Sequence, residues 1–560
     1  MGYLILIIGC FEVLYGMAQT YSGSEHIWWY KKVAHRNVVS GTYLNRNHFA
    51  GLMEMGILLA TAYVAAISTK IRKREIISGQ ISNARVRISR FLSWEQKFNK
   101  RTLFLFAGAV MGIGLVFSAS RGGLISACGG LFCMSLFLVF RKNHRRKGLI
   151  ILIMFLIIAV YTLPIGIYYT LSRFKSFGDS FETRTRLAQK TMDLFGDYRL
   201  TGIGVGNFQY AYPKYQASEH KTFYIQHAHN DWSEFMAEAG IIGLCFLLAG
   251  FFYYVFDTMK LWKRRRDPFA ICLGAAPLAV LTAVGIHSYS DYNLHTPANF
   301  ILLMAIVAIG YSALHLERHH HREKTLYRHH VLPMNYKGIS VLLMILVLSL
   351  WSGIWTVRHF MAECYCNTVP NPTLNRDQNP SIEEINKAII WDRWNAEYWN
   401  KLAVELIRVR GEGLSFWNVK EGRKKQMEII RALEKAVRLN PLREEYHMRL
   451  GLEYTNLWQD PDSSQRWMPA ADLCMERAAY FAGNRYPYHH AMMGHYWIIR
   501  SKSINPADPA WEKALSSASW HYKKTLSLES GHERKRMIKE IKKNIRIHYP
   551  DEAFVKNIME

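Results

Sequence analysis

The sequence predicts an all-α protein: a polytopic membrane helix bundle followed by a soluble α-helical domain. Two observations lead to this prediction. From Tyr3 to about Phe360, long apolar stretches alternate with short basic ones, and half of the 560 residues are hydrophobic. Beyond Phe360 the chain is polar and rich in Trp, Tyr and charged residues. We therefore expect a membrane domain over 1–361 and a soluble domain over 362–560.

About nine stretches are long and apolar enough to span a bilayer, which takes about 20 residues. The first stretch lacks the basic start and the small-residue cleavage site of a signal peptide, so it too is predicted to be a transmembrane helix. The predicted spans lie near 3–19, 49–69, 103–119, 122–140, 149–170, 237–257, 269–288, 297–316 and 338–359.

The chain has a net charge of +26, and basic residues gather in four clusters between apolar runs, at 70–75, 141–147, 260–267 and 315–324. This is the pattern of cytoplasmic loops under the positive-inside rule, and it argues against nucleic-acid binding. The opposite, outer face then carries one long loop, 171–236, and the C-terminal domain. The eight cysteines show neither a zinc spacing nor a disulfide framework.

Arginines on that outer face suggest an anion site. Arg121 lies between two apolar runs and is followed by two glycines, which let a ligand approach the backbone closely. Its planar guanidinium suits phosphate oxygens, although an arginine that only anchors a helix at the interface is the alternative. Together with Arg184, Arg186 and Arg46 it would form a positive pocket for a lipid-linked pyrophosphate.

His229 is the best candidate for a general base, because a neutral imidazole exists at ordinary pH. A histidine that merely anchors the following helix is the alternative. Asn230 can bind a sugar hydroxyl or cap that helix. His227 lies two residues before His229, but no third metal ligand is evident, so no metal site is predicted. The polar stretch 287–299, which includes Asp291 and Asn293, is either the wall of a water-filled cavity or a hydrogen-bonded brace.

The C-terminal part repeats a helix, a short turn and a second helix. The stretches 386–406, 434–454 and 477–497 align on Ala388, Ala436 and Ala479. They resemble tetratricopeptide (TPR) repeats, which stack into a solenoid that binds partners. An irregular helical bundle is the alternative.

Five motifs together resemble the O-antigen ligase and polymerase superfamily of bacterial envelope glycosyltransferases. The pair His229-Asn230 is followed by nine residues and then by Gly240-Ile-Ile-Gly243, as in the family signature. The other four motifs are "GTYLNRNHFAG" (41–51), "SASRGG" (118–123), the loop segment from "ETRTR" to "GVGNF" (182–208), and "DYNLHTPAN" (291–299).

The resemblance implies metal-independent, inverting glycan transfer without a cofactor, at the outer face of the bacterial inner membrane. The donor would be a glycan on undecaprenyl pyrophosphate, and the acceptor a glycan, lipid or protein, as in lipopolysaccharide biosynthesis. Arg121 and Arg184 would hold the pyrophosphate, and His229 would activate the acceptor hydroxyl. Further substrate contacts are expected from Arg186, Asn230, Arg46, Asn47, Asp291 and Asn293. Family members usually have about a dozen spans, so this chain is expected to begin several helices late, as a shortened gene product.

Other functions stay open at this point. A polymerase or a protein O-oligosaccharyltransferase of the same superfamily would share the donor chemistry and differ in the acceptor. A flippase for the same lipid would need a polar path through the bilayer, and the sequence places few charges in mid-helix. A non-catalytic membrane scaffold is the remaining class. The C-terminal repeats fit capture of an acceptor or of a partner protein.

Overall fold

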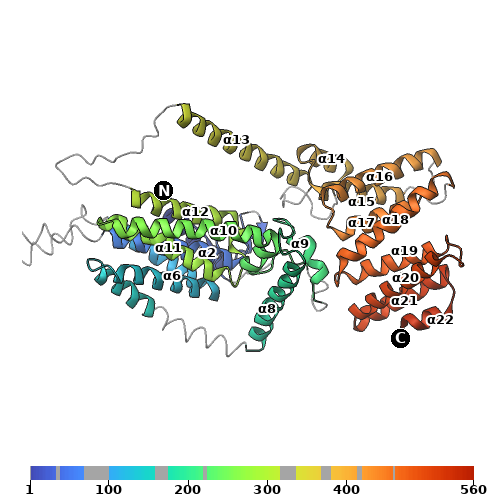
Figure 1. Cartoon of the computed structure of the whole chain (residues 1–560), viewed down its shortest axis with the longest axis horizontal. Helices are drawn as coiled ribbons and strands as arrows, with labels where there is room; N and C mark the ends of the chain where they lie inside the picture. The colour runs from blue at the N-terminus through green and yellow to red at the C-terminus, as the bar shows by residue number, and fades with distance from the viewer. Residues whose placement is uncertain are drawn as a thin grey trace, which may run out of the picture. The chain divides into compact units, whose positions relative to one another are not determined.

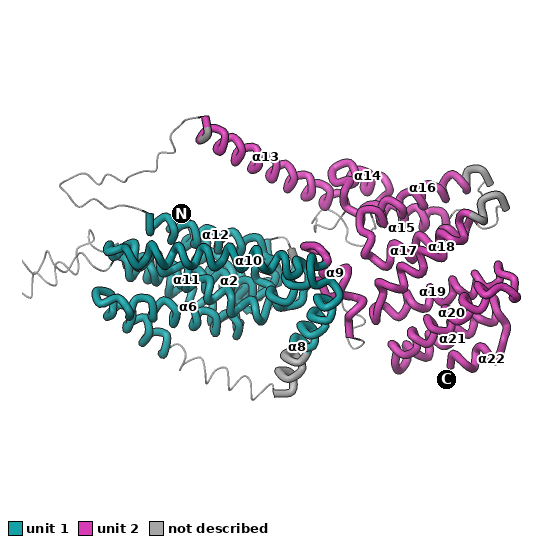
Figure 2. The backbone as a smooth tube through the Cα atoms, in the orientation of Figure 1, with its two compact units in different colours: residues 1–202, 227–332 teal, residues 203–226, 333–560 magenta. Residues whose placement is uncertain are grey.

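The structure, a computed structural model, describes residues 2–28, 30–32, 38–67, 100–157, 174–217, 224–315, 336–366, 380–412, 419–457 and 461–559. In these ranges the chain is helical apart from turns and one hairpin, which confirms the all-α prediction (Figure 1). It divides into two compact units, coloured separately in Figure 2. Unit 1 comprises 1–202 and 227–332, and unit 2 comprises 203–226 and 333–560.

Unit 1 is a bundle of long apolar helices. Its helices are α1 (Gly2–Tyr21), α2 (Arg46–Ile67), α5 (Lys100–Phe117), α6 (Arg121–Val139), α8 (Phe174–Asp197), α10 (Asp231–Arg264), α11 (Pro268–His287), η4 (Asn293–His295) and α12 (Pro297–His315). The strands β1 (His26–Ile27) and β2 (Tyr30–Lys31) pair antiparallel, with His26 opposite Lys31.

Eight helices among the described residues are long and apolar enough to cross a membrane, so the chain is a multi-pass membrane protein. Seven are α1, α2, α5, α6, α10, α11 and α12 of unit 1; the eighth belongs to α13 (Tyr336–Tyr365) of unit 2. The predicted span 149–170 lies only partly within the described residues, which are helical from 145 to 157 there.

Small residues let the central helices of unit 1 approach closely, as in many membrane bundles. A Cβ on Gly130 of α6 would lie 2.5 Å from Leu58 of α2 and 3.0 Å from the carbonyl oxygen of Ala279 in α11. A Cβ on Gly310 of α12 would lie 2.1 Å from the Pro277 ring of α11. α2 and α11 are accordingly the most enclosed spans.

A kink at Gly240 shapes the start of α10. Gly240 has φ of 64°, a left-handed conformation inside an otherwise regular helix. The kink lets the backbone amides of Ile241 and Ile242 donate to the carbonyl oxygens of Arg199 and Leu200, at 2.8 and 3.1 Å. A Cβ at Gly240 would lie 2.3 Å from the Leu200 carbonyl oxygen, so only glycine fits.

Gly240→Ala is therefore expected to destabilise the protein by more than about 2 kcal/mol, through the left-handed φ and the backbone clash. Thermal unfolding of the purified protein in detergent measures this change. Gly250→Ala is the matched control, because a Cβ at Gly250 of the same helix meets nothing within 4 Å. Equal unfolding temperatures for the two variants would contradict the account of the kink.

Unit 2 is a succession of helices with its own apolar core. Beyond α13 its helices are α14 (Ile382–Trp391), α15 (Ala396–Glu412), α16 (Val419–Leu439), α17 (Glu444–Thr455), α18 (Pro461–Ala482), α19 (Pro487–Ser501), α20 (Pro509–Leu528), α21 (Gly531–His548) and α22 (Glu552–Met559). Each stretch proposed as a repeat forms a helix, a short turn and a second helix. Ala388 and Ala436 are buried, whereas Ala478 rather than Ala479 takes that place in the third stretch.

The stretch predicted as one long loop, 171–236, contains regular structure. Its first part forms the amphipathic helix α8 in unit 1. Residues 203–226, with the short helices α9 (Phe208–Ala211) and η2 (Tyr212–Tyr215), belong to unit 2 together with the C-terminal helices. Sequence periodicity could not show this grouping, because it depends on contacts between residues more than 200 positions apart.

Candidate active site around the 288–296 turn

Residues 288–296 join α11 to α12 and form a buried polar turn in unit 1, called here the 288–296 turn. The side chains of Ser288, Asp291 and Asn293 are each at most 3% exposed. The backbone amide of Asp231, at the start of α10, donates to the carbonyl oxygen of Ser288 at 2.9 Å. This bond fixes the 288–296 turn to the segment that carries His229.

His229 lies directly against the 288–296 turn. Its backbone has φ of 51°, a left-handed conformation that is uncommon for a non-glycine residue and often marks functional sites. Its Nδ1 lies 3.4 Å from Oδ1 of Asp291, and its ring meets the Tyr292 ring edge-on at 4.9 Å. The His229 side chain is 39% exposed, whereas Asp291 is buried. The imidazole thus has an anion on one side and an accessible edge on the other.

Asp291 is an anion at the centre of this arrangement. Burial alone would raise its pKa, but the hydrogen bond and charge of His229, the Tyr292 amide and the charge of His48 together hold the pKa well below its ordinary value. The Asn47 amide also donates to the carboxylate. Asp291 therefore stays ionised at physiological pH and can orient and stabilise a protonated His229.

Arg184 and the start of the helix that carries Arg121 lie against the same turn at Ser290. The Arg184 guanidinium, on α8, donates to the carbonyl oxygen of Ser290 at 2.9 Å. Arg121 begins α6, and a Cβ on the next residue, Gly122, would lie 2.8 Å from Oγ of Ser290. The N-terminus of α6 is thus packed against the turn. The structure therefore brings Arg184 and His229 to adjacent turn positions, 290 and 291, with the N-terminus of α6 beside them.

Two of the residues predicted to make polar contacts with the substrate, Asn230 and Asn293, lie within hydrogen bonds of the protein itself. Asn230 caps α10 by accepting from the Ser233 amide and donates to the Tyr289 carbonyl oxygen at 3.1 Å. Asn293 is buried and accepts from Asn299 at 3.2 Å. These two residues brace the 288–296 turn.

The remaining predicted residues lie at helix starts or on the surface. Arg46 and Asn47 are the first two residues of α2, and Asn47 reaches Asp291 directly. Arg186 is exposed on α8, two positions beyond Arg184. Asn47 thereby contacts the site directly.

Beside this site, His227, Glu234 and His295 bring possible metal-ligand atoms within 4.8 Å of one another. The sequence showed no third ligand near His227 because His295 is distant along the chain. Glu234 Oε1 lies 2.8 Å from His227 Nδ1 and 3.3 Å from His295 Nε2, and Asp231 Oδ1 lies 2.8 Å from His295 Nδ1. Burial opposes the charged form of His295, but the hydrogen bond to Asp231 and the charge of Glu234 raise its pKa. Both ring nitrogens of His295 thus lie within 3.3 Å of a carboxylate oxygen, of Asp231 on one side and of Glu234 on the other.

Sequence reasoning missed Tyr292, whose ring is surrounded by three imidazoles. His227 stacks on it with centroids 4.3 Å apart, and the rings of His48 and His229 meet it edge-on at 4.6 and 4.9 Å. The sequence did contain a hint of this role, because Tyr292 is an aromatic residue within a largely polar turn. Tyr292 fixes the positions of the histidines relative to Asp291.

A second missed feature is a buried pair inside the bundle. Oε2 of Glu54, on α2, lies 3.0 Å from Nδ1 of His287 at the end of α11, and both side chains are 1% exposed. Glu54 is the one acidic residue in α2. Because a charge inside a membrane is costly, an acidic residue in a predicted span could have been singled out from the sequence as functional. The pair ties α2 to the helix that leads into the 288–296 turn.

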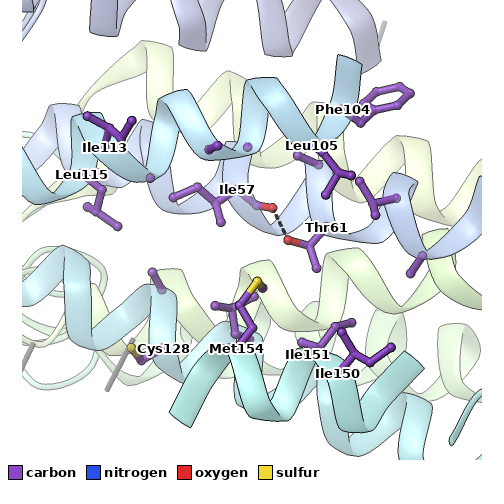
Figure 3. Close-up of a pocket in the computed structure, with 18 of the residues that line it drawn as sticks. Ile57, Thr61, Phe104, Leu105, Ile113, Leu115, Cys128, Ile150, Ile151 and Met154 are labelled. Atoms are coloured by element: carbon purple, nitrogen blue, oxygen red, sulfur yellow. Dashed lines mark hydrogen bonds between the residues drawn. The ribbon is translucent and has the colours of Figure 1, made fainter. Parts of the chain in front are cut away.

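An apolar cavity of about 660 Å³ lies between α2, α5, α6 and the 145–157 helix. Figure 3 shows Phe104 and Leu105 at one end and Ile113 and Leu115 at the other. The lining residues on α5 extend from Arg101 to Phe117. At 1.5 Å per residue, this part of the helix is about 24 Å long. The cavity thus follows most of one span and reaches residues a few positions from Arg121.

Comparison with known proteins gives one family. No curated protein matches the chain. The family described as O-antigen ligase matches residues 106–248. The matched segment contains Arg121, Arg184, His229 and the glycine pair Gly240 and Gly243. The match supports a place for this membrane protein in the O-antigen ligase superfamily of glycosyltransferase-like membrane enzymes, which act on glycans of the bacterial envelope.

Proposed function

We propose that this protein is a glycosyltransferase of the O-antigen ligase type. It moves a glycan from undecaprenyl pyrophosphate to an acceptor hydroxyl at the outer face of the bacterial inner membrane, with the 171–236 region and the C-terminal domain extracytoplasmic. The observation that carries the proposal is the gathering of Arg184, the α6 N-terminus with Arg121, and the His229–Asp291 pair around one buried turn.

In this mechanism the arginines bind the leaving group. When the bond between the anomeric carbon and the pyrophosphate oxygen breaks, negative charge grows on the pyrophosphate. Arg184 and Arg121 present guanidinium groups to this charge, and the amides at the α6 N-terminus add a favourable helix dipole. Such fixed cations stabilise the transition state more than the substrate.

His229 handles the proton. The acceptor oxygen forms a bond to the anomeric carbon on the face opposite the pyrophosphate, and its proton passes to the imidazole of His229. Direct displacement inverts the anomeric centre. The ionised Asp291, 3.4 Å from Nδ1, stabilises the imidazolium that results. The proton then leaves to solvent through the exposed edge of the ring.

This chemistry needs no metal ion and no cofactor. The His227, Glu234 and His295 group supports the placement of His229, because Glu234 pairs with His227 and accepts from the Ala228 amide, and His227 stacks on Tyr292. Transfer by the purified protein is accordingly expected to be unaffected by EDTA. A loss of activity with EDTA that zinc or magnesium restores would contradict this assignment.

The apolar cavity provides a place for the isoprenoid chain of the donor. Its lining is mostly hydrocarbon, which an isoprenoid needs, and it reaches Phe117 at the end of α5, four positions before Arg121. A pyrophosphate held by Arg121 would then continue into a lipid chain along α5. In this proposal, membrane lipids compete with the isoprenoid chain of the donor for the apolar cavity.

Gly112→Phe tests this placement of the donor. Gly112 lines the cavity, and a Cβ there meets nothing within 4 Å, so a phenyl ring fills the cavity without disturbing the helix contacts. We expect KM for the lipid-linked donor to rise about 10-fold, which corresponds to about 1.4 kcal/mol of lost binding. Gly112→Ala is the smaller control, expected to keep KM within about twofold. An unchanged KM in the phenylalanine variant would exclude the cavity as the chain-binding site.

Glycan analysis of cells that carry inactive variants tests the function and identifies the acceptor class. Accumulation of long glycans on undecaprenyl pyrophosphate indicates a ligase, and accumulation of single repeat units indicates a polymerase. Loss of glycan from a protein indicates a protein O-oligosaccharyltransferase. Unchanged glycans at normal protein levels would favour a non-catalytic scaffold.

A further inference from the structure

We propose that residues 390–395, the end of α14 and the turn that leads into α15, bind the membrane surface at the point where α13 leaves the bilayer. This segment is called here the 390–395 turn. Its exposed side chains, Ile390 and Trp394, enter the phospholipid headgroup region of that leaflet. The inference goes beyond the proposed function, because it requires α13 to span a membrane and makes no use of glycan transfer. All of its residues belong to unit 2.

The sequence of α13 indicates where the hydrocarbon core ends along this helix. Residues 338–357 include no charged side chain, and at 1.5 Å per residue they are about 30 Å long, the thickness of the hydrocarbon core. Arg358 and His359 follow directly. The Trp355 ring lies one turn earlier, 4.7 Å from the His359 ring, and tryptophan is enriched at membrane interfaces. We therefore expect the edge of the hydrocarbon core at Arg358.

The 390–395 turn is attached to α13 at this same level. Nε of Arg358 donates to the carbonyl oxygen of Trp391 at 2.9 Å. Nε2 of His359 lies 3.5 Å from Oδ2 of Asp392, whose side chain is buried. The first two charged or titratable side chains beyond the span thus both contact the turn. Because these contacts are made at the edge of the hydrocarbon core, the turn lies at the membrane surface.

The other contacts of this helix pair lie further along α13. The Tyr398 hydroxyl, in the first turn of α15, donates to Oε1 of Glu363 at 2.9 Å. Ala362 and Cys366, near the end of α13, share a buried apolar cluster with residues of α14 and α15. The two helices therefore pack against the end of α13, where Figure 1 shows α14. Among these contacts, those of the 390–395 turn are closest to the hydrocarbon core.

The exposed side chains of the turn suit a headgroup region. Ile390 is 74% exposed and Trp394 is 58% exposed. The Arg393 guanidinium lies 5.0 Å from the centre of the Trp394 ring, and the Lys435 ammonium lies 5.7 Å from it. Apolar side chains beside cations are typical of segments that lie in the membrane interface, where the cations pair with lipid phosphates. The phospholipid surface is therefore the partner that both the position and the chemistry of the turn favour.

The test uses photocrosslinking of the full-length protein in nanodiscs of phosphatidylethanolamine and phosphatidylglycerol. The photoreactive residue p-benzoylphenylalanine replaces Trp394 in one protein and Trp520 in the other. Trp520 is the matched control, because it is 52% exposed and lies on α20, which packs against α19, α21 and α22 of the same unit. Mass spectrometry after irradiation measures the lipid and peptide adducts. We expect at least about tenfold more lipid adduct at position 394 than at position 520.

Arg358→Ala, added to the protein with the photoreactive residue at position 394, tests the attachment to α13. Loss of its hydrogen bond to the turn should lower the lipid adduct at least about threefold, whereas Arg534→Ala, at an exposed arginine of α21, should leave it unchanged. Equal lipid adducts at positions 394 and 520, or adducts at 394 only to this chain or to a second copy, would overturn the inference. An unchanged adduct in Arg358→Ala would overturn the placement by α13. None of these results depends on glycan transfer.

Discussion

Replacing His229 by alanine is expected to lower the rate of glycan transfer about 10²–10⁴-fold, the usual contribution of a positioned general base. The variant loses the group that takes the acceptor proton and leaves Asp291 without the imidazole that lies 3.4 Å from it. In cells, undecaprenyl-linked glycan should accumulate and the product should disappear. Mass spectrometry of extracted lipid-linked glycans measures both.

His26→Ala is the matched control for this variant. His26 is an exposed histidine in β1, and it belongs to none of the contacts around the 288–296 turn described above. Its replacement should leave the glycans unchanged. A His229→Ala protein that is present at normal level and still transfers glycan at the wild-type rate would remove His229 from the mechanism.

The second large effect is expected from Arg184→Ala, a loss of about 10²–10³-fold in kcat/KM, typical of removing one fixed group that stabilises transition-state charge. The arginine is anchored to the 288–296 turn through the Ser290 carbonyl oxygen, so its loss affects both charge and position. Arg184→Lys should recover part of the rate, because an ammonium keeps the charge but not the planar fork. Initial rates with purified lipid-linked donor measure the effect.

Arg186→Ala separates the role of Arg184 from a general effect of positive charge. Both arginines are exposed on α8, and two positions on a helix point in very different directions. We expect Arg186→Ala to lower kcat/KM less than tenfold. If the two alanine variants lose activity equally, a diffuse positive surface rather than a fixed Arg184 contact holds the leaving group.

The spans of the membrane domain could be predicted from the sequence because hydropathy is a local property. The eight helices of sufficient length and apolarity agree with predicted spans to within a few residues, apart from α13, which runs on to Tyr365, and α10, which runs on to Arg264 as one kinked helix. The kink itself could not be predicted, because it depends on backbone hydrogen bonds between α10 and residues 199 and 200.

The sequence predicted which residues could form the candidate site, but it did not predict how those residues are arranged in space. Its motifs pointed to Arg121, Arg184 and His229, and the structure brings their surroundings together at positions 290 and 291. Asn230 and Asn293 instead brace the turn. Tyr292 could not be ranked from sequence, because its importance comes from histidines on two distant segments, His48 on one and His227 and His229 on the other, that meet its ring.

The C-terminal domain illustrates the same limit. Its helix pairs follow from local amphipathic patterns, and the stretches around Ala388 and Ala436 show them clearly. Its contact with Tyr224 depends on Arg443 and Arg485, more than 200 positions away, and no local pattern encodes such a contact. Long-range packing of this kind decides which part of a predicted loop belongs to which unit.

The central claim is that Arg184, Arg121 and His229 act together on a lipid-linked pyrophosphate. The most direct measurement is a transfer assay in nanodiscs that counts both undecaprenyl pyrophosphate released and glycan joined to the acceptor. We expect one pyrophosphate lipid released per glycan transferred by the wild-type protein, and both products formed at least about 10²-fold more slowly by the His229→Ala and Arg184→Ala proteins. Release without transfer by the wild-type protein, or equal turnover by all three proteins, would contradict the central claim.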